Sequence, residues 1–369
     1  MTKAELDNRK ILPLEDSWYR RVKEKLDGIA KPLDGLGKFE HLIAQIGAIE
    51  KTTKISIQKK AVLVMCADNG VVEEQVSQSG KEVTLAVAKA MGVNNSSVGK
   101  MAAVAGVDEC LSNYKIPEAA GVDVIPVDIG IDTDEVIPGV LPRKVAKGTK
   151  NFAKEPAMTE EEVLKAIETG IQLVQQCHRE GYEILATGEM GIGNTTTSTA
   201  VAAALLDLEV EQVTGKGAGL TDEALKRKCR VIEEAIEKYS LRDADAFTIL
   251  KTVGGLDIAG LTGVFIGAAI EQIPVVIDGV ISAVAALLAE TLCKGAVNYM
   301  IPSHKSRELA ETAIMKKLHL DPVLDADMAL GEGTGAVMMM SLLDVALGVY
   351  LQGASFANFE IEQYKRYEE

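Results

Sequence analysis

Short apolar runs alternate with amphipathic stretches along this chain. An apolar run after Lys60 predicts a buried parallel strand at 60–66, and further strands are predicted at 122–130, 182–187 and 274–278. Apolar residues spaced three and four apart predict helices between these strands, at about 81–104, 160–179, 194–206 and 222–238, and a later one at 337–350. The order of strands and helices predicts an α/β fold, a doubly wound parallel sheet with helices on both faces.

The regions outside this alternation are simpler. Residues 15–52 show a helical pattern with a kink at 31–37, and residues 140–160 have the composition of an exposed loop. The apolar region 253–292 is interrupted by Asp257, Glu271 and Asp278, so it predicts no membrane span. The first ten residues lack the apolar stretch of a signal peptide.

Charge and cysteine content limit the partners. A formal net charge of −15 over 369 residues disfavours nucleic acid and anionic membranes, because both would repel the protein. The five cysteines contain no C-x-x-C pair, which favours a reducing cytoplasm. The four histidines are dispersed, so the sequence predicts no metal site.

The most informative segment runs from a predicted strand through a glycine loop into a helix rich in hydroxyl groups. Gly188, Gly191 and Gly193 allow backbone conformations closed to other residues and let a ligand approach the main chain. The following helix begins with Asn194 and Thr195, and its free N–H groups form an anion site. The segment predicts a phosphate-binding loop.

Three other interpretations of this loop remain. It can be a structural turn that merely requires glycines. Its spacing matches a nucleotide-triphosphate P-loop, but Asn194 stands where that loop needs a lysine. A dinucleotide fingerprint lacks its third glycine. A mononucleotide phosphate therefore fits the loop best.

A second glycine-rich segment places Glu332 between Gly331 and Gly333, at the entry to an apolar helix. Most surface glutamates are simply solvated, so the residue alone indicates little. A carboxylate on a flexible backbone that an apolar helix anchors is nevertheless a good candidate for a general base.

Taken together, these segments resemble the nicotinate-nucleotide:dimethylbenzimidazole phosphoribosyltransferase family, which makes the lower-ligand nucleotide of cobamides. The resemblance covers nearly the whole chain, and its motifs occur at 31–37, 67–71, 188–196, 254–259, 278–283, 303–306 and 330–336. It implies a Rossmann-like domain at 56–304, a small helical domain built from 1–55 with 305–369, and a dimer with itself or a homologous subunit.

The resemblance also implies roles for individual residues. Glu332 aligns with the family's catalytic base, which activates the incoming aglycone while nicotinate leaves the ribose. The donor, nicotinate mononucleotide, is expected to be bound by Gly188, Glu189, Gly191, Ile192, Gly193, Asn194, Thr195, Lys216 and Gly333. A pyridinium leaving group already carries positive charge, so no metal or cofactor is expected.

The sequence departs from the family pattern around the aglycone. Asn69 replaces a histidine, Lys81 replaces a glutamine, and residues 308–311 differ from the usual Glu-Pro-Gly-His. The aglycone pocket is expected to include Asn69, Ser77, Lys81 and Leu330. A cation at position 81 would stabilise a phenolate, whereas a benzimidazole that attacks through a ring nitrogen has little use for it. The sequence therefore predicts that dimethylbenzimidazole is not the preferred acceptor, with a phenol that attacks through its oxygen as the candidate. A non-catalytic partner subunit and a P-loop-like NTPase are the alternative functions.

Overall fold

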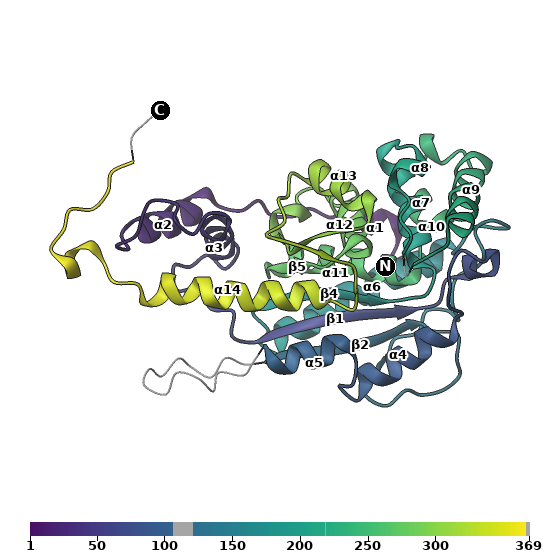
Figure 1. The fold of residues 1–369 in the computed structure, drawn as a ribbon, viewed down its shortest axis with the longest axis horizontal. Helices are drawn as coiled ribbons and strands as arrows, with labels where there is room; N and C mark the ends of the chain where they lie inside the picture. Colours follow the sequence, from purple (N-terminus) through teal and green to yellow (C-terminus); the bar gives the residue numbers. More distant parts are fainter. Residues whose placement is uncertain (106–120, 218, 367–369) are drawn as a thin grey trace.

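The computed structural model describes residues 1–105, 121–217 and 219–366. Its main feature is a parallel sheet of six strands in the order β3-β2-β1-β4-β5-β6 (Figure 1). The strands are β1 (Lys60–Ala67), β2 (Val122–Gly130), β3 (Leu141–Pro142), β4 (Ile184–Met190), β5 (Val275–Ile277) and β6 (Met300–Pro302). This is the strand order of the Rossmann fold, as predicted.

The sheet reverses its direction of growth between β1 and β4. Strands are added outward from β1 through β2 to β3, and the chain then returns to place β4 on the other side of β1. Ligands of open parallel sheets bind at such a reversal, beyond the carboxyl ends of the strands. The fold therefore brings together the segments that follow β1, β4, β5 and β6.

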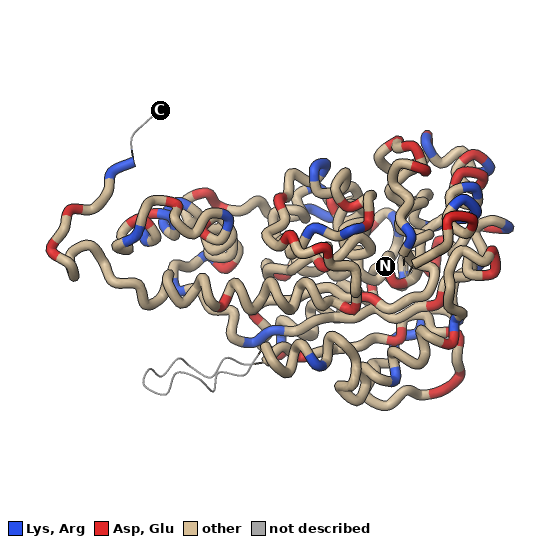
Figure 2. Tube along the Cα trace, viewed as in Figure 1, with Lys and Arg blue, Asp and Glu red and all other residues tan. Residues whose placement is uncertain are grey.

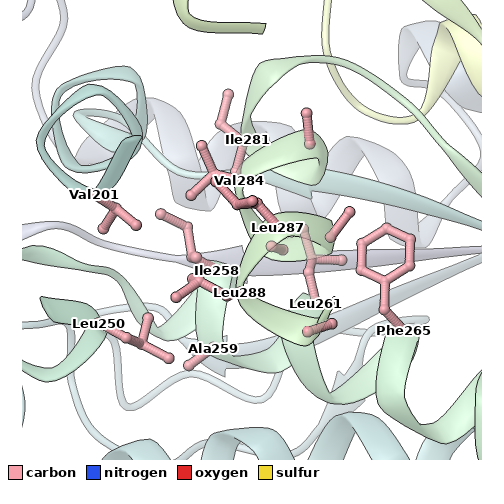
Figure 3. Packing of buried hydrophobic residues seen from close by; sticks show 14 of the residues in the cluster. Val201, Leu250, Ile258, Ala259, Leu261, Phe265, Ile281, Val284, Leu287 and Leu288 are labelled. Carbon is pink, nitrogen blue, oxygen red and sulfur yellow. The ribbon is translucent and has the colours of Figure 1, made fainter. Parts of the chain in front are cut away.

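Both faces of the sheet are covered, because successive side chains of a strand point to opposite faces. In β1, Leu63 and Met65 belong to one core cluster, while Val62 and Val64 belong to the other. The first cluster includes α6 (Glu160–Arg179), α7 (Asn194–Leu206), α10 (Ala246–Val253), α11 (Leu256–Glu271) and α12 (Val280–Leu292). Figure 3 shows part of it, including Leu261 and Phe265 of α11 and Leu287 of α12.

The second cluster lies on the opposite face. It is built by α2 (Asp16–Asp27), α3 (Lys38–Ile49), α4 (Glu82–Gly92), α5 (Ser97–Val104) and α14 (Thr334–Gln352). In Figure 1, α2 and α3 lie beside α14 at one end of the molecule, and α7 to α10 lie at the other.

Local signals explain where the predicted helices begin and end. The helices predicted at 160–179, 194–206 and 222–238 have the observed bounds of α6, α7 and α9 (Asp222–Lys238). A capping box between Thr159 and Glu162 begins α6, and Thr221 caps α9. One prediction was wrong: 81–104 is two helices, because Asn94 adopts a positive φ and Ser96 starts α5 with a cap.

Short elements escaped the sequence analysis. The predicted loop 140–160 contains the two-residue strand β3, and no pattern predicted β6. A separate two-stranded parallel sheet joins β7 (His304–Ser306) to β8 (Leu324–Met328). Strands β3, β6 and β7 have two or three residues and are too short to show an alternation.

The terminal segments divide between the two clusters. Leu6 of α1 (Lys3–Asp7) and Ile314 of α13 (Leu309–Leu318) belong to the first cluster, with the helices of the predicted Rossmann-like domain. Helices α2, α3 and α14 share the second cluster. The predicted domains at 56–304 and at 1–55 with 305–369 stay a prediction.

Within the described residues, α14 is the one helix whose length and composition would allow it to cross a membrane. In the fold it packs into the second cluster, and 56% of its apolar stretch is buried.

Figure 2 shows acidic and basic residues interspersed along the chain, for example on α9. The short helix α8 (Val210–Val213) lies between α7 and α9 in the chain.

Candidate functional site

The loop between β4 and α7 is held by its neighbours. A Cβ at Gly191 would lie 2.5 Å from the carbonyl oxygen of Ala67, and Gly193 adopts a φ of +93°. Both positions therefore require glycine. The Ile192 N–H donates to the hydroxyl of Thr84 on α4 at 3.1 Å, which ties the loop to that helix.

A cleft of about 220 Å³ opens beside this loop. The starts of α7 and α12 both line it, and neither helix has a side-chain cap at its N-terminus. Two helix N-termini therefore present backbone N–H groups and positive dipole ends to one cleft. Its lining includes Glu189, Gly191, Ile192, Asn194, Thr195, Gly217, Asp278, Ser282, His304, Ser306, Glu308, Leu330 and Gly331.

A buried lysine supports the cleft from behind. Lys228 on α9 has no exposed surface, and its ammonium group donates to the Thr195 hydroxyl at 3.0 Å and to the Gly215 carbonyl at 3.1 Å. Burial lowers the pKa of Lys228 to about 8. Lys216, which the sequence analysis assigned to the phosphate, instead pairs with Asp222 at 2.7 Å and is half exposed.

Glu332 lies in a strained turn beside β4. Its φ is +62°, between Gly331 at +81° and Gly333 at +93°, and a left-handed conformation costs a non-glycine residue about 1–2 kcal/mol. Its carboxylate accepts the Val98 N–H at 3.0 Å, at the start of α5. Glu332 is thus held at a helix N-terminus, while its neighbours Leu330 and Gly331 line the cleft.

Asp278 fixes this turn from the end of β5. One of its carboxylate oxygens accepts the Gly333 N–H at 3.1 Å, and the other accepts the Ala336 N–H at 3.0 Å. Asp278 therefore serves as the N-terminal cap of α14, whose own first residues supply none. A Cβ at Gly188 would lie 2.5 Å from the Glu332 carbonyl oxygen, so β4 packs directly on the turn.

Three carboxyl groups gather at the strand ends. The Asn194 amide donates to Glu189 and, at 3.1 Å, to Asp257 at the start of α11. Burial raises the pKa of Glu189 to about 8, of Asp278 to about 7 and of Asp257 to about 6, and the proximity of like charges adds to the shifts of Glu189 and Asp257. At neutral pH these groups therefore do not all carry charge.

The residues predicted for the aglycone lie on several elements. Asn69 follows β1, is fully buried and donates to the Ile192 carbonyl at 3.4 Å. Ser77 accepts the Ser79 N–H at 3.3 Å, and Lys81 pairs with Asp132 at 3.6 Å. Leu330 is 57% exposed at the cleft. Of these four residues, only Leu330 lines the cleft beside the glycine loop.

The sequence analysis missed several residues of this site, above all Lys228. On α9 this lysine occupies the apolar stripe that continues with Val231, Ile232 and Ala235. A lysine on a buried stripe is a signal that could have identified it, because buried lysines are rare unless paired. The motifs at 254–259, 278–283 and 303–306 also contain site residues to which their sequence pattern alone assigns no role: Asp257, Asp278, His304 and Ser306.

A cluster of three carboxylates lies outside the cleft, at Asp27, Asp34 and Glu40. Arg366 binds Asp27 and Asp34, Lys23 binds Asp34 and Glu40, and Lys31 also binds Glu40. These side-chain cations already balance the carboxylates, and they fasten the C-terminal tail to the α2–α3 hairpin. The cluster is accounted for without a metal ion.

Comparisons with known proteins agree over most of the chain. A model of a family described as phosphoribosyltransferase matches residues 11–361. The nicotinate-nucleotide–dimethylbenzimidazole phosphoribosyltransferase of Clostridium acetobutylicum is 42% identical over 352 residues, covering 95% of this chain and 96% of that protein. The protein of the same name from Acetivibrio thermocellus is 43% identical, covering 93% and 94%.

A solved structure is similar as well. The crystal structure of CobT from Thermus thermophilus superposes with a TM-score of 0.85 at 32% identity, covering 94% of this chain and all of that one.

Proposed function

This chain belongs to the nicotinate-nucleotide–dimethylbenzimidazole phosphoribosyltransferase family, and we propose that its cleft transfers a phosphoribosyl group from nicotinate mononucleotide to a lower-ligand base. The observation that carries the proposal is the pair of uncapped helix N-termini beside a buried lysine. Nicotinate mononucleotide carries two anionic groups, a phosphate and a carboxylate. Two anion sites in one cleft match that ligand.

The phosphate is assigned to the α7 side of the cleft. Thr195 and Gly217 line that side, and Lys228 lies behind Thr195. The nicotinate carboxylate is assigned to the start of α12, where the buried Ser282 hydroxyl has no partner among the described residues. A donor held at both ends presents its ribose between Glu189 and the turn of Glu332.

Glu332 acts as the general base in this proposal. The acceptor's ring nitrogen forms a bond to the anomeric carbon of the ribose, while the bond from that carbon to nicotinate breaks. The electron pair of that bond returns to the pyridinium ring, so nicotinate leaves without being protonated by an acid. Glu332 takes the acceptor's N–H proton. Glu189 faces the positive charge that develops on the ribose, which favours its ionised form.

The acceptor is proposed to be a benzimidazole-type base. The expectation of a phenol rested on a free cation at Lys81, and Asp132 already pairs with that side chain. Two relatives carry dimethylbenzimidazole in their names. Neither alternative function gains support: Asn194 bonds to carboxylates where a P-loop lysine would bind phosphate, and Glu332 is retained where a non-catalytic subunit would not need it.

Donor binding is expected to depend on Lys228. Lys228→Met should weaken the binding of nicotinate mononucleotide by about 10–100-fold, because a hydrogen bond to a charged group contributes about 1.5–3 kcal/mol. Binding of nicotinate riboside, which lacks the phosphate, should change little. Isothermal titration of both ligands measures the difference, and Lys226→Met, an exposed lysine on the same helix, is the matched control.

The same experiment has a pH signature. Because the pKa of Lys228 is lowered to about 8, wild-type affinity should fall as pH rises through 8 and the ammonium group loses its proton. In Lys228→Met this decline should disappear. Equal losses for the mononucleotide and the riboside would remove Lys228 from the phosphate site.

We propose further that two copies associate through α14, in the cytoplasm. Met338, Val345 and Val349 are exposed along one stripe of this helix, which begins at the Glu332 turn. The chain's acidic charge makes a second copy a better occupant of this stripe than an anionic membrane. Light scattering should report the mass of two chains; the mass of one chain would contradict the proposal.

A further inference from the structure

Glu308 is a charged group in the donor cleft that the mechanism does not use. It precedes α13 at the N-cap position, but its side chain makes no capping bond to that helix. Instead, one carboxylate oxygen accepts the Gly217 N–H at 3.1 Å. A Cβ at Gly215 would overlap the other oxygen, so the carboxylate is pressed against this loop.

The groups around Glu308 are those assigned to the donor phosphate. Gly217 donates to it, Thr195 lines the same side of the cleft, and Lys228 bonds to both Thr195 and Gly215. Glu308 also counteracts the effect of burial on Lys228, since its charge raises the pKa of that lysine. Among the described residues that line the cleft there is no lysine or arginine, so Lys228 is the nearby cation for either anion.

We propose that the Glu308 carboxylate occupies the phosphate subsite of the ligand-free protein and competes there with incoming phosphate. A carboxylate and a dianionic phosphate repel each other, so they do not share one cation and one N–H donor. A ligand must therefore bring enough binding energy to displace Glu308. This inference rests on the proposed function, because it makes Glu308 a specificity determinant for that donor.

The displaced side chain has an alternative position nearby. Helix α13 is ten residues long, and its N-cap residue, Glu308 itself, makes no capping hydrogen bond. Rotation of the Glu308 side chain would bring its carboxylate to the N–H groups of its own helix, where a negative charge is favourable. Displacement thus exchanges one set of N–H donors for another.

Competition of this kind selects for the complete donor. Nicotinate mononucleotide gains contacts through its ring carboxylate and ribose, and these offset the displacement of Glu308. Inorganic phosphate has only the subsite itself, so Glu308 excludes it more effectively. The protein would therefore keep its cleft free in a phosphate-rich solution.

Glu308→Gln tests the competition directly. Glutamine keeps an oxygen for the Gly217 N–H and removes the charge. Isothermal titration should show inorganic phosphate binding about tenfold tighter than to the wild type, because occupancy of a site by an internal competitor lowers apparent affinity in proportion. The mononucleotide should also bind more tightly, and nicotinate riboside should be unchanged. Glu308→Ala, which removes the competitor altogether, should tighten phosphate binding at least as much.

Asp325→Asn is the matched control. Asp325 is exposed on β8 and pairs with Lys305 on β7, so the change removes one negative charge without altering a residue that lines the cleft. It should leave phosphate affinity unchanged. A similar gain in this control would mean that net charge, not occupancy, sets the affinity, and would overturn the inference.

Two other outcomes would also overturn it. Unchanged phosphate affinity in both Glu308 variants would make Glu308 a structural contact of the loop. Weaker mononucleotide binding in Glu308→Gln would make it a donor-binding group. Failure of the wild type to bind nicotinate mononucleotide at all would instead contradict the proposed function, and the inorganic phosphate titration would still decide the role of Glu308.

Discussion

Replacing Glu332 by glutamine is expected to lower kcat by about 10²–10⁴-fold, the usual contribution of a positioned general base. Glutamine keeps the oxygen that accepts the Val98 N–H at the start of α5, so the turn should retain its geometry. Donor affinity should stay close to that of the wild type. Single-turnover rates and donor titration measure the two quantities, and Glu237→Gln on the exposed face of α9 is the matched control.

A change of acceptor distinguishes a base from a structural residue. A nitro-substituted benzimidazole has a more acidic N–H group and depends less on a base, so it should recover part of the rate lost in Glu332→Gln. If Glu332 only holds the turn against α5, Glu332→Gln should lower the rate by the same factor with every acceptor. A kcat within about threefold of the wild type would exclude Glu332 as the base, because such a group contributes at least about 10²-fold.

The second large effect requires no change in any functional group. Gly188→Ala should lower kcat by about 10²-fold, because its Cβ would lie 2.5 Å from the Glu332 carbonyl oxygen and 3.0 Å from the Gly333 nitrogen. Backbone atoms cannot rotate away from the contact as a flexible side chain does, so the whole turn that carries Glu332 must move. Overpacking of this kind also costs about 1–3 kcal/mol of stability.

Steady-state kinetics and thermal unfolding together test this prediction. Gly28→Ala is the control, since a Cβ there meets only the Lys25 carbonyl at 3.4 Å and the Glu24 carbonyl at 3.7 Å, ordinary contacts, and its φ of −78° suits alanine. An unchanged kcat in Gly188→Ala would show that β4 does not position Glu332.

The sequence predicted those parts of the fold whose signals are local. Helices α6 and α9 begin at capping threonines, and α7 begins after a glycine, so their bounds could be read directly. The buried strand β1 is an apolar run of seven residues after Lys60. Strand β6 has three residues, and β3 is recognisable only through its pairing with β2.

The residues of the site divide in the same way, into those with a local sequence signal and those without one. Gly193 and Glu332 lie in glycine-rich segments, and the spacing of these glycines in the sequence predicts an unusual backbone conformation. Lys228 lies behind the cleft on α9, and only tertiary contacts show that it bonds to Thr195 while Lys216 pairs with Asp222. The expected role of Lys81 likewise depended on a partner, Asp132, that the sequence places 51 positions away.

The most direct test of the account is the product formed by the purified protein from nicotinate mononucleotide with equal amounts of dimethylbenzimidazole and phenol. Proton NMR identifies both the linkage and the anomeric configuration. We predict that nicotinate and an N-linked benzimidazole ribotide appear in equal amounts, with the α configuration that a single inverting displacement produces. Release of nicotinate without any ribotide, or a product that keeps the β configuration of the donor, would contradict the account.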